Sequence, residues 1–283
     1  MKTALIITTY NWPLALSLVL KSVREQSLIP DEVIIADDGS EDETRRLIQR
    51  EALDFPCTLK HSWQEDIGFR VARSRNLAIA SSKSDYIILI DGDMVLHRHF
   101  VRDHIKVARA GFFTQGSRVL MSAPASAKLL TTGQIKLNFF SPGIVRRRHT
   151  LRLPLLGQFW LQLTAGKNRH GIKTCNQAWQ RDDLIRLNGF DERMMAWGCE
   201  DEELAARAFH SGLKRQDCRF TALAYHLWHK ERRNNDCSPN LKFLHETNRL
   251  QLTRAADGLD KHIYTSGHDA YARSPDTISG SSS

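Results

Sequence analysis

The sequence predicts an α/β fold in which helices cover both faces of a mostly parallel central sheet. Over the first hundred residues, short apolar runs rich in β-branched residues alternate with longer amphipathic stretches. This alternation is typical of parallel strands joined by helical crossovers. The chain has 283 residues, of which 41% are hydrophobic and 25% charged, so it is long enough to build a sizeable core.

Predicted elements alternate without interruption over the first 110 residues: strand 3–10, helix 14–27, strand 31–40, helix 41–53, strand 57–63, helix 70–82, strand 85–94 and helix 98–110. The first strand reads TALIITTY, and a short β-branched run of this kind indicates a buried strand. The first helix places Leu16, Val19, Leu20 and Val23 on one face. Sheets built in this way bind ligands beyond the carboxyl ends of their strands.

The pattern is less regular after residue 110. The predicted elements are a strand at 111–123, a strand, short helix and turn over 175–192, a helix at 200–212, a strand at 219–229 and a helix at 240–252. Residues 124–170 predict no clear element, because Pro, Gly and Arg interrupt an apolar background. The Ser-rich end has the composition of a disordered tail.

The net charge of +8 comes from one segment. Residues 111–170 contain nine Lys or Arg and no Asp or Glu, so the rest of the chain is close to neutral. We expect an anionic partner to meet this segment. The segment contains no recognisable nucleic-acid-binding module, so we expect no nucleic-acid partner.

Cysteine usage and hydropathy favour a cytoplasmic location. The five cysteines are odd in number and none is spaced as CxxC, which argues against a disulfide framework or a zinc ribbon. The N-terminus has too few apolar residues for a secretory signal. The longest apolar runs, such as YIILI at 86–90, are far shorter than a membrane helix.

Three strand ends carry polar clusters, at residues 8–11, 37–40 and 91–93. If the strands are parallel, these clusters converge on one rim of the sheet. Asp91 and Asp93 lie two apart on an extended chain, so both carboxylates can face one divalent cation, and the glycine between them lets a ligand approach. The alternative for such a sequence is a solvated turn after a strand.

The stretch WGCEDEE (197–203) places four carboxylates in consecutive positions. One interpretation is an acidic first turn that stabilises the start of a helix. The other is that one of the four is a catalytic base. Successive helical residues are about 100° apart, so at most two of them can face one site.

Taken in order, ITTYNW, IIADDGS, RSRN and IILIDGDM resemble the successive signatures of the family 2 glycosyltransferases. These are inverting enzymes with the A-type nucleotide-sugar fold, which has a Rossmann-like sheet. Residues 187–204, LNGFDERMMAWGCEDEEL, resemble the galactosyltransferase-type C-terminal region of chondroitin-polymerase-like enzymes. The resemblance covers about two thirds of the chain, and the ordered set of motifs carries it.

The resemblance implies a uridine site built from Thr8, Tyr10 and Asp38. A carboxylate at a strand end can accept the N–H of a pyrimidine, and a hydroxyl and an aromatic ring can flank the base. Arg75 matches a nucleotide-side arginine, with Arg73 as the nearby alternative. For Thr8 and Tyr10, the competing interpretation is that they are ordinary strand residues.

The resemblance also implies a metal site. Asp91 matches the ribose-facing residue of a DxD motif, and Asp93 matches the residue that holds Mn²⁺ (or Mg²⁺) against the diphosphate. His226 matches a third metal ligand. His229 is the competitor, because a residue three positions along a strand points to the opposite face.

For the catalytic residues, the resemblance implies that Asp201 is the base and that Glu200 is its neighbour in the acceptor site. Trp197 offers a flat apolar face to a donor or acceptor sugar ring, and Gly198 leaves room beside it. The competing interpretation of Trp197 is a core aromatic residue.

The predicted function is metal-dependent, inverting transfer of a sugar from a UDP-sugar to a glycan or lipid-linked acceptor, in bacterial surface polysaccharide or lipopolysaccharide synthesis. Residues 1–110 are predicted to bind the nucleotide sugar, 111–265 to form the acceptor-binding and catalytic half, and 266–283 to be a disordered tail. The alternatives are a non-catalytic nucleotide- or glycan-binding protein and a sugar nucleotidyltransferase. The latter would need a Gly-rich loop that TTYNWPLA lacks.

The basic segment leaves two possibilities open. Residues 143–163 combine three consecutive arginines with Leu, Phe and Trp, which suits an anionic membrane surface or a phosphorylated glycolipid. The enzyme would then be peripheral on the inner face of the membrane. The alternative is a basic acceptor groove on a fully soluble enzyme.

Overall fold

The computed structural model describes residues 1–230 and 239–265, so the predicted tail at 266–283 lies outside the described residues. Within this part of the chain, the strands are β1 (Thr3–Thr9), β2 (Glu32–Asp37), β3 (Thr58–Trp63), β4 (Tyr86–Asp91), β5 (Met94–Leu96), β6 (Phe112–Gly116), β7 (Arg118–Leu120), β8 (Asn176–Gln180), β9 (Lys214–Cys218) and β10 (Ala224–His226). Seven of them form the central sheet, in the order β3-β2-β1-β4-β8-β6-β9. Strands β1 to β4 run parallel to one another, as the sequence predicts, while β8 runs antiparallel to both β4 and β6.

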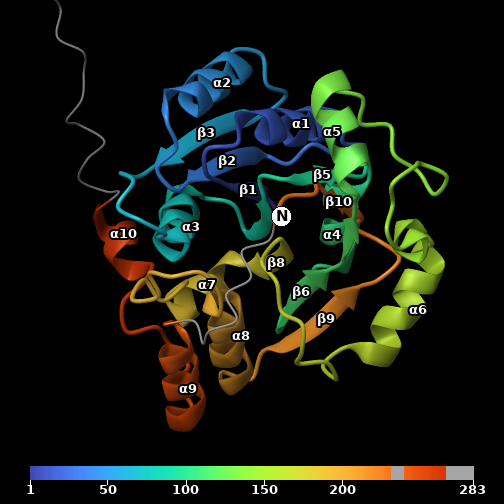
Figure 1. Ribbon diagram of the computed structural model, residues 1–283. Coiled ribbons are helices and arrows are strands. Elements are labelled where there is room, and N and C mark those ends of the chain that lie inside the picture. Colours follow the sequence, from blue (N-terminus) through green and yellow to red (C-terminus); the bar gives the residue numbers. More distant parts are fainter. Residues whose placement is uncertain (231–238, 266–283) are drawn as a thin grey trace, which may run out of the picture.

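Helices cover both faces of this sheet (Figure 1). Their bounds are α1 (Pro13–Arg24), α2 (Asp42–Ala52), α3 (Val71–Ser81), α4 (Phe100–Val107), α5 (Ala123–Thr132), α6 (Pro154–Thr164), α7 (Arg181–Leu187), α8 (Glu200–His210), α9 (Leu241–Leu250) and α10 (Asp260–Thr265). One core cluster joins α1, α2 and α4 to residues such as Leu5 and Ile7 of β1. Alternate residues of the same strand, Ala4 and Ile6, pack on α3, α7 and α8. The fully buried β1 therefore explains why its sequence is a continuous apolar run.

A second sheet lies beside the first, in the order β5-β10-β7. Each of its strands has three residues. His226 on β10 is paired with Met94 on β5, so the segment that follows the DGD motif lies against the strand that ends in this histidine. This small sheet joins the two halves of the sequence at one edge of the cleft described below.

Two predicted strands are wrong in their extent. The run over 111–123 divides into β6 and β7, which belong to different sheets. The run over 219–229 contains the short β10, while β9 lies just before it. The segment 124–170, where the sequence predicts no clear element, contains α5, α6 and a 3₁₀ turn at Arg147–Thr150. No helix among the described residues is long and apolar enough to span a membrane.

Candidate active site

A cleft of about 1000 Å³ opens at the carboxyl ends of β1, β2 and β4. Its lining includes all of the site residues that the sequence predicts: Thr8, Tyr10, Asp38, Arg75, Asp91, Asp93, Trp197, Gly198, Glu200, Asp201 and His226. The register explains part of this convergence, because Thr8 lies beside Ala36 on one neighbouring strand and Asp91 on the other. The strand ends form one wall of the cleft, called here the sheet wall, and the start of α8 forms another, called the α8 wall.

Two adjacent aspartates at the end of β2 have separate structural roles. Asp37 is fully buried, accepts a hydrogen bond from the backbone N–H of Ser40, and lies 2.8 Å from a ring nitrogen of His61. Asp38 lines the cleft, where its carboxylate accepts hydrogen bonds from Gln64 Nε2 and from the backbone N–H of Arg70. Burial raises the pKa of Asp38, and the two hydrogen bonds partly oppose the rise. The carboxylate is thus held in one orientation at the cleft.

Tyr10 stands at the mouth of the cleft with 48% of its surface exposed. Its phenol donates a hydrogen bond of 2.9 Å to Asp66, and this bond raises the pKa of Tyr10. The loop bearing Asp66 lies close against Gly39, where a Cβ would approach the Asp66 backbone to 2.6 Å. The glycine of the ADDGS run is therefore needed for close approach, and its φ of +97° is one that favours glycine.

Arg75 is buried beneath the cleft and bonds residues from both of its walls. Its guanidinium donates to Thr8 Oγ1 at 3.2 Å, Glu200 Oε1 at 3.1 Å and Asp91 Oδ1 at 3.4 Å. These carboxylates raise the pKa of Arg75 against the opposing effect of burial, so it stays charged. Arg73, the alternative from sequence, instead donates to Gln64 Oε1. Arg75 joins the two walls, while Arg73 supports the residue that orients Asp38.

One carboxylate and two imidazoles form a cluster where the DGD motif meets the end of β10. Asp93 Oδ2 is 3.4 Å from His226 Nε2 and 3.2 Å from His229 Nε2, and possible ligand atoms of the three residues all lie within 4.8 Å of one another. The expectation that His229 points away is wrong, because β10 ends at His226 and the strand rule no longer applies three residues later. Both histidines therefore reach Asp93.

The DGD motif also depends on its glycine. A Cβ on Gly92 would come within 2.9 Å of the Thr8 carbonyl oxygen, so no side chain fits between β1 and the turn after β4. Burial raises the pKa of Asp91 to about 6, which Arg75 opposes. Asp91 and Asp93 thus face different partners, Arg75 and the histidine pair respectively.

The four carboxylates of WGCEDEE separate into distinct environments at the start of α8. Glu203 is buried against Arg207 in an ion pair of 2.7 Å, so it has a structural role. Glu202 is exposed to solvent, and Glu200 is buried and bonded to Arg75. Asp201 lines the cleft, and burial beside Glu200 raises its pKa to about 7.

The backbone before α8 sets this arrangement. Gly198 and Cys199 have φ values of +94° and +69°, so the chain turns sharply before the helix begins at Glu200. The turn leaves Trp197 at the cleft with 50% of its surface exposed, so the interpretation of Trp197 as a core aromatic is wrong. A half-exposed indole beside a cleft presents an apolar face to a ligand.

Some cleft residues were not predicted from the sequence. Asp66, which lines the cleft, and Gln64, which lies behind the lining and bonds Asp38, both follow β3, so they too lie after the carboxyl end of a parallel strand. The strand-end rule that predicted the other clusters could have found them. Arg118 and Lys173 add positive charge to the lining, and no motif marks them.

The comparisons with known proteins agree with this architecture. Residues 4–141 match the family described as glycosyl transferase family 2, and residues 166–230 match the family described as N-terminal domain of galactosyltransferase. Chondroitin synthase of Escherichia coli is 26% identical over 241 residues, which is 79% of this chain and 34% of the relative. The chain thus spans about a third of that relative's length.

Two solved structures share the fold. TarS residues 1–349 from S. aureus, in complex with UDP-GlcNAc, aligns with a TM-score of 0.59 at 14% identity, over 93% of this chain and 69% of that one. A mannosyltransferase from Pyrobaculum calidifontis, in complex with GDP-Man and Mn²⁺, aligns with a TM-score of 0.56 at 17% identity, over 94% and 73%. At such identities the likeness concerns the fold.

Proposed function

The chain belongs to the family 2 glycosyltransferases, and on that premise we propose that it transfers a sugar from a UDP-sugar to a glycan or lipid-linked acceptor, with inversion at the anomeric carbon. The observation that carries the proposal is the gathering in one cleft of the strand-end polar groups, the Asp–His–His cluster and a carboxyl group with a pKa near neutrality. We assign the enzyme to bacterial surface polysaccharide or lipopolysaccharide synthesis, with support from the chondroitin synthase relative.

The sheet wall supplies the proposed nucleotide site. Asp38 is held in place to accept the N–H of uracil, with Tyr10 beside the base and Thr8 on the strand next to it. Asp91 is proposed to face the ribose. Arg75 lies buried behind them and contributes a positive charge that attracts the diphosphate. The UDP-GlcNAc complex of the structural neighbour supports a nucleotide-sugar donor.

The residues of the histidine cluster fit a divalent cation. Asp93 Oδ1 is buried without a hydrogen-bond partner, so it retains lone pairs that a cation can use. The imidazoles of His226 and His229 favour Mn²⁺ over Mg²⁺, because Mg²⁺ prefers oxygen ligands. When bound, such a cation would neutralise the negative charge that develops on the diphosphate leaving group. The Mn²⁺ in the mannosyltransferase neighbour supports this assignment.

The α8 wall supplies the proposed base. An acceptor hydroxyl must lose its proton as it attacks, and a carboxylate whose pKa lies near 7 is well matched to accept that proton at neutral pH. Asp201 is therefore the proposed base, with Glu200 holding Arg75 beside it. Attack from the face opposite the leaving group inverts the anomeric carbon and needs a single carboxylate and no covalent intermediate.

This assignment divides the chain by role. Residues 1–110 provide the groups proposed for the donor, while 111–265 provide Asp201, both histidines and the proposed sugar-contacting pair Trp197 and Gly198. The indole face of Trp197 can stack on a sugar ring, and the glycine beside it leaves space for one.

A panel of UDP-sugars tests the proposal. We expect one or more of them, with Mn²⁺, to raise the melting temperature of the protein and to be hydrolysed slowly to UDP in the absence of acceptor. GDP-sugars serve as the matched controls for recognition of the uracil base, and EDTA serves as the control for the metal. If no nucleotide sugar stabilises the protein or is hydrolysed, the proposed function is wrong.

A further inference from the structure

The exposed apolar side chains of this protein are concentrated on one flank. Among the described residues, twenty large hydrophobic side chains are exposed, and nine of them lie between Phe139 and Leu163. Phe140 and Leu155 are 84% and 83% exposed. This segment, residues 139–163, is called the basic apolar face below. Apolar side chains gathered in this way mark a surface that binds something.

Helix α6 forms the apolar part of this face. It contains no charged residue, and Gly157 is the one residue of the helix that is buried. A Cβ on Gly157 would lie 3.0 Å from the Arg219 carbonyl oxygen, so the helix rests on the chain after β9 through this glycine. Leu155, Phe159 and Leu163, spaced four residues apart, are left exposed.

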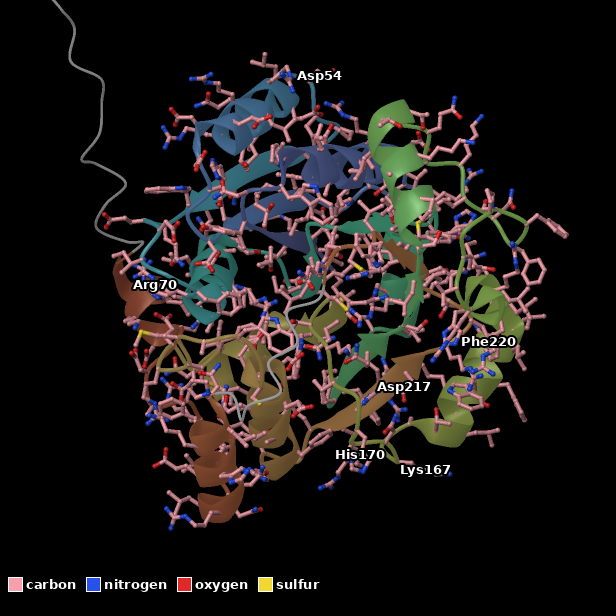
Figure 2. The ribbon with its side chains drawn as sticks, in the orientation of Figure 1. Asp54, Arg70, Lys167, His170, Asp217 and Phe220 are labelled. Atoms are coloured by element: carbon pink, nitrogen blue, oxygen red, sulfur yellow. The ribbon has the colours of Figure 1, made fainter. Side chains whose placement is uncertain are left out.

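The helix is nevertheless fixed to the body of the protein. Trp160 packs edge-on against Phe220, with their ring centroids 6.4 Å apart. Arg152, just before the helix, makes two hydrogen bonds of 2.8 and 2.6 Å to the buried Asp103. Figure 2 shows Phe220 close to α6, and Figure 1 shows the helix at the rim of the molecule. The exposed leucines and phenylalanine are thus presented outward on a helix held in place.

Positive charge borders the apolar residues. Arg146, Arg147 and Arg148 are exposed, and the surrounding segment 111–170 contains no acidic residue. A protein partner would require a complementary acidic surface, whereas a bilayer with anionic headgroups supplies both the negative charge and the apolar layer below it. Such a bilayer matches this combination in charge and in chemistry.

The face also adjoins the proposed reaction centre. Val145, immediately before the three arginines, lines a second cavity of about 450 Å³. The same cavity is lined by His226 and His229 of the proposed metal cluster, and by Trp228 between them. A molecule arriving along the basic apolar face would therefore reach the cleft from the side of the histidines.

We propose that the basic apolar face docks on an anionic lipid bilayer and receives a lipid-linked acceptor there, through the second cavity. The acceptor role rests on the proposed function, while the docking itself does not. The apolar side chains of α6 enter the headgroup boundary and the arginines pair with anionic headgroups. The enzyme is then peripheral on the inner face of the membrane.

Flotation with vesicles tests the docking. We expect the full chain to float with phosphatidylcholine vesicles that contain phosphatidylglycerol, to stay unbound with pure phosphatidylcholine, and to be released by high salt. Leu155→Asp with Phe159→Asp should lower the bound fraction at least about tenfold, because charges enter the apolar contact. The triple change of Arg146, Arg147 and Arg148 to Gln should do the same, because it removes the pairing with headgroups.

Controls lie on α2 and at the residue directly after it, at another edge of the molecule (Figure 1). Leu53→Asp changes an equally exposed leucine, and changing Arg45, Arg46 and Arg50 to Gln removes the same charge, so both should float as the wild type does. Circular dichroism and the melting temperature without ligand, measured on every variant, show that each one is folded, and the UDP-induced thermal shift is measured separately. Wild-type protein that stays unbound, or face variants that still float, would overturn the docking. Failure of the proposed function would instead appear as loss of the UDP response with flotation unchanged.

Discussion

The two walls of the cleft hold their carboxylates in different ways. On the sheet wall, Asp38 is bonded by Gln64 and by a backbone N–H, and Asp91 is paired with Arg75. On the α8 wall, Asp201 accepts a hydrogen bond from the backbone N–H of the residue after it, and its pKa is near neutrality. Burial raises the pKa of Asp91 as well, to about 6, but Asp91 is held by Arg75, so the sheet wall presents groups suited to binding, while the α8 wall presents one carboxyl group suited to exchanging a proton.

This difference separates binding from chemistry. A change on the α8 wall should slow transfer and leave UDP and Mn²⁺ bound, while a change on the sheet wall should weaken binding first. Arg75 joins the walls through Glu200, so the separation holds for residues that do not touch it. The substitutions below avoid this arginine for that reason.

The largest expected effect is that of Asp201→Asn. The amide keeps the shape of the side chain and cannot accept the acceptor proton, so we expect kcat to fall by about 100- to 10,000-fold. UDP and Mn²⁺ affinities, measured by calorimetry, should stay within about twofold of wild type. Glu202→Gln changes the exposed carboxylate next to Asp201 on the same helical turn, so it is the matched control and should transfer normally. If Asp201→Asn transfers at the wild-type rate, the base is elsewhere, and Glu200 is the next candidate.

Substitutions in the metal cluster should weaken ligand binding, whereas Asp201→Asn should slow transfer and leave binding intact. Asp93→Asn, His226→Ala and His229→Ala each remove one proposed ligand, so we expect each to weaken Mn²⁺ binding by at least about 10- to 100-fold. Mn²⁺ titration of the UDP complex measures this, and UDP affinity should fall together with that of the metal. His245→Ala, an exposed histidine on α9, is the control. If His229→Ala behaves like the control, the site uses Asp93 and His226 without it.

The pH dependence of transfer tests the proposed role of Asp201 on the α8 wall. Burial beside Glu200, which Arg75 partly opposes, raises the pKa of Asp201 to about 7. A base must be deprotonated to act, so kcat should fall about tenfold per unit below pH 7 and level off above it. The measurement is made with Mn²⁺ saturating at each pH, because histidine ligands also take up protons. The residual kcat of Asp201→Asn should not show this fall below pH 7. A wild-type kcat that stays constant from pH 5 to 8 would contradict the assignment of Asp201 as the base.

The sheet wall was largely predictable from the sequence. Strands buried on both faces must be apolar throughout, so β1 and β4 could be placed to within a few residues, and helix 70–82 corresponds to α3 at Val71–Ser81. Parallel strands end at a common edge, which is why Thr8, Asp38 and Asp91 could be expected to meet.

The small sheet, α6 and the position of His229 were less predictable from the sequence, for physical reasons. Strands β5, β7 and β10 have three residues each, too few to show a periodicity. Helix α6 buries Gly157 and exposes its leucines, so its apolar pattern does not point towards a core. His229 lies beyond the end of β10, where strand geometry no longer predicts the direction of a side chain.

The smallest expected effect comes from Gln64→Leu, on the sheet wall. Leucine has a similar volume but can neither donate to Asp38 nor accept from Arg73, so the uracil-facing carboxylate loses one of the two bonds that orient it. A hydrogen bond to a charged group contributes about 1.5–3 kcal/mol, and the remaining bond from the Arg70 N–H retains part of the orientation, so we expect UDP to bind about 3- to 10-fold more weakly. Calorimetry with UDP measures the change, with kcat at saturating donor expected to stay near wild type. Gln49→Leu, at an exposed position on α2, is the control. A fall in kcat with unchanged UDP affinity would show that the sheet wall acts on the chemistry, and the separation of the two walls would be wrong.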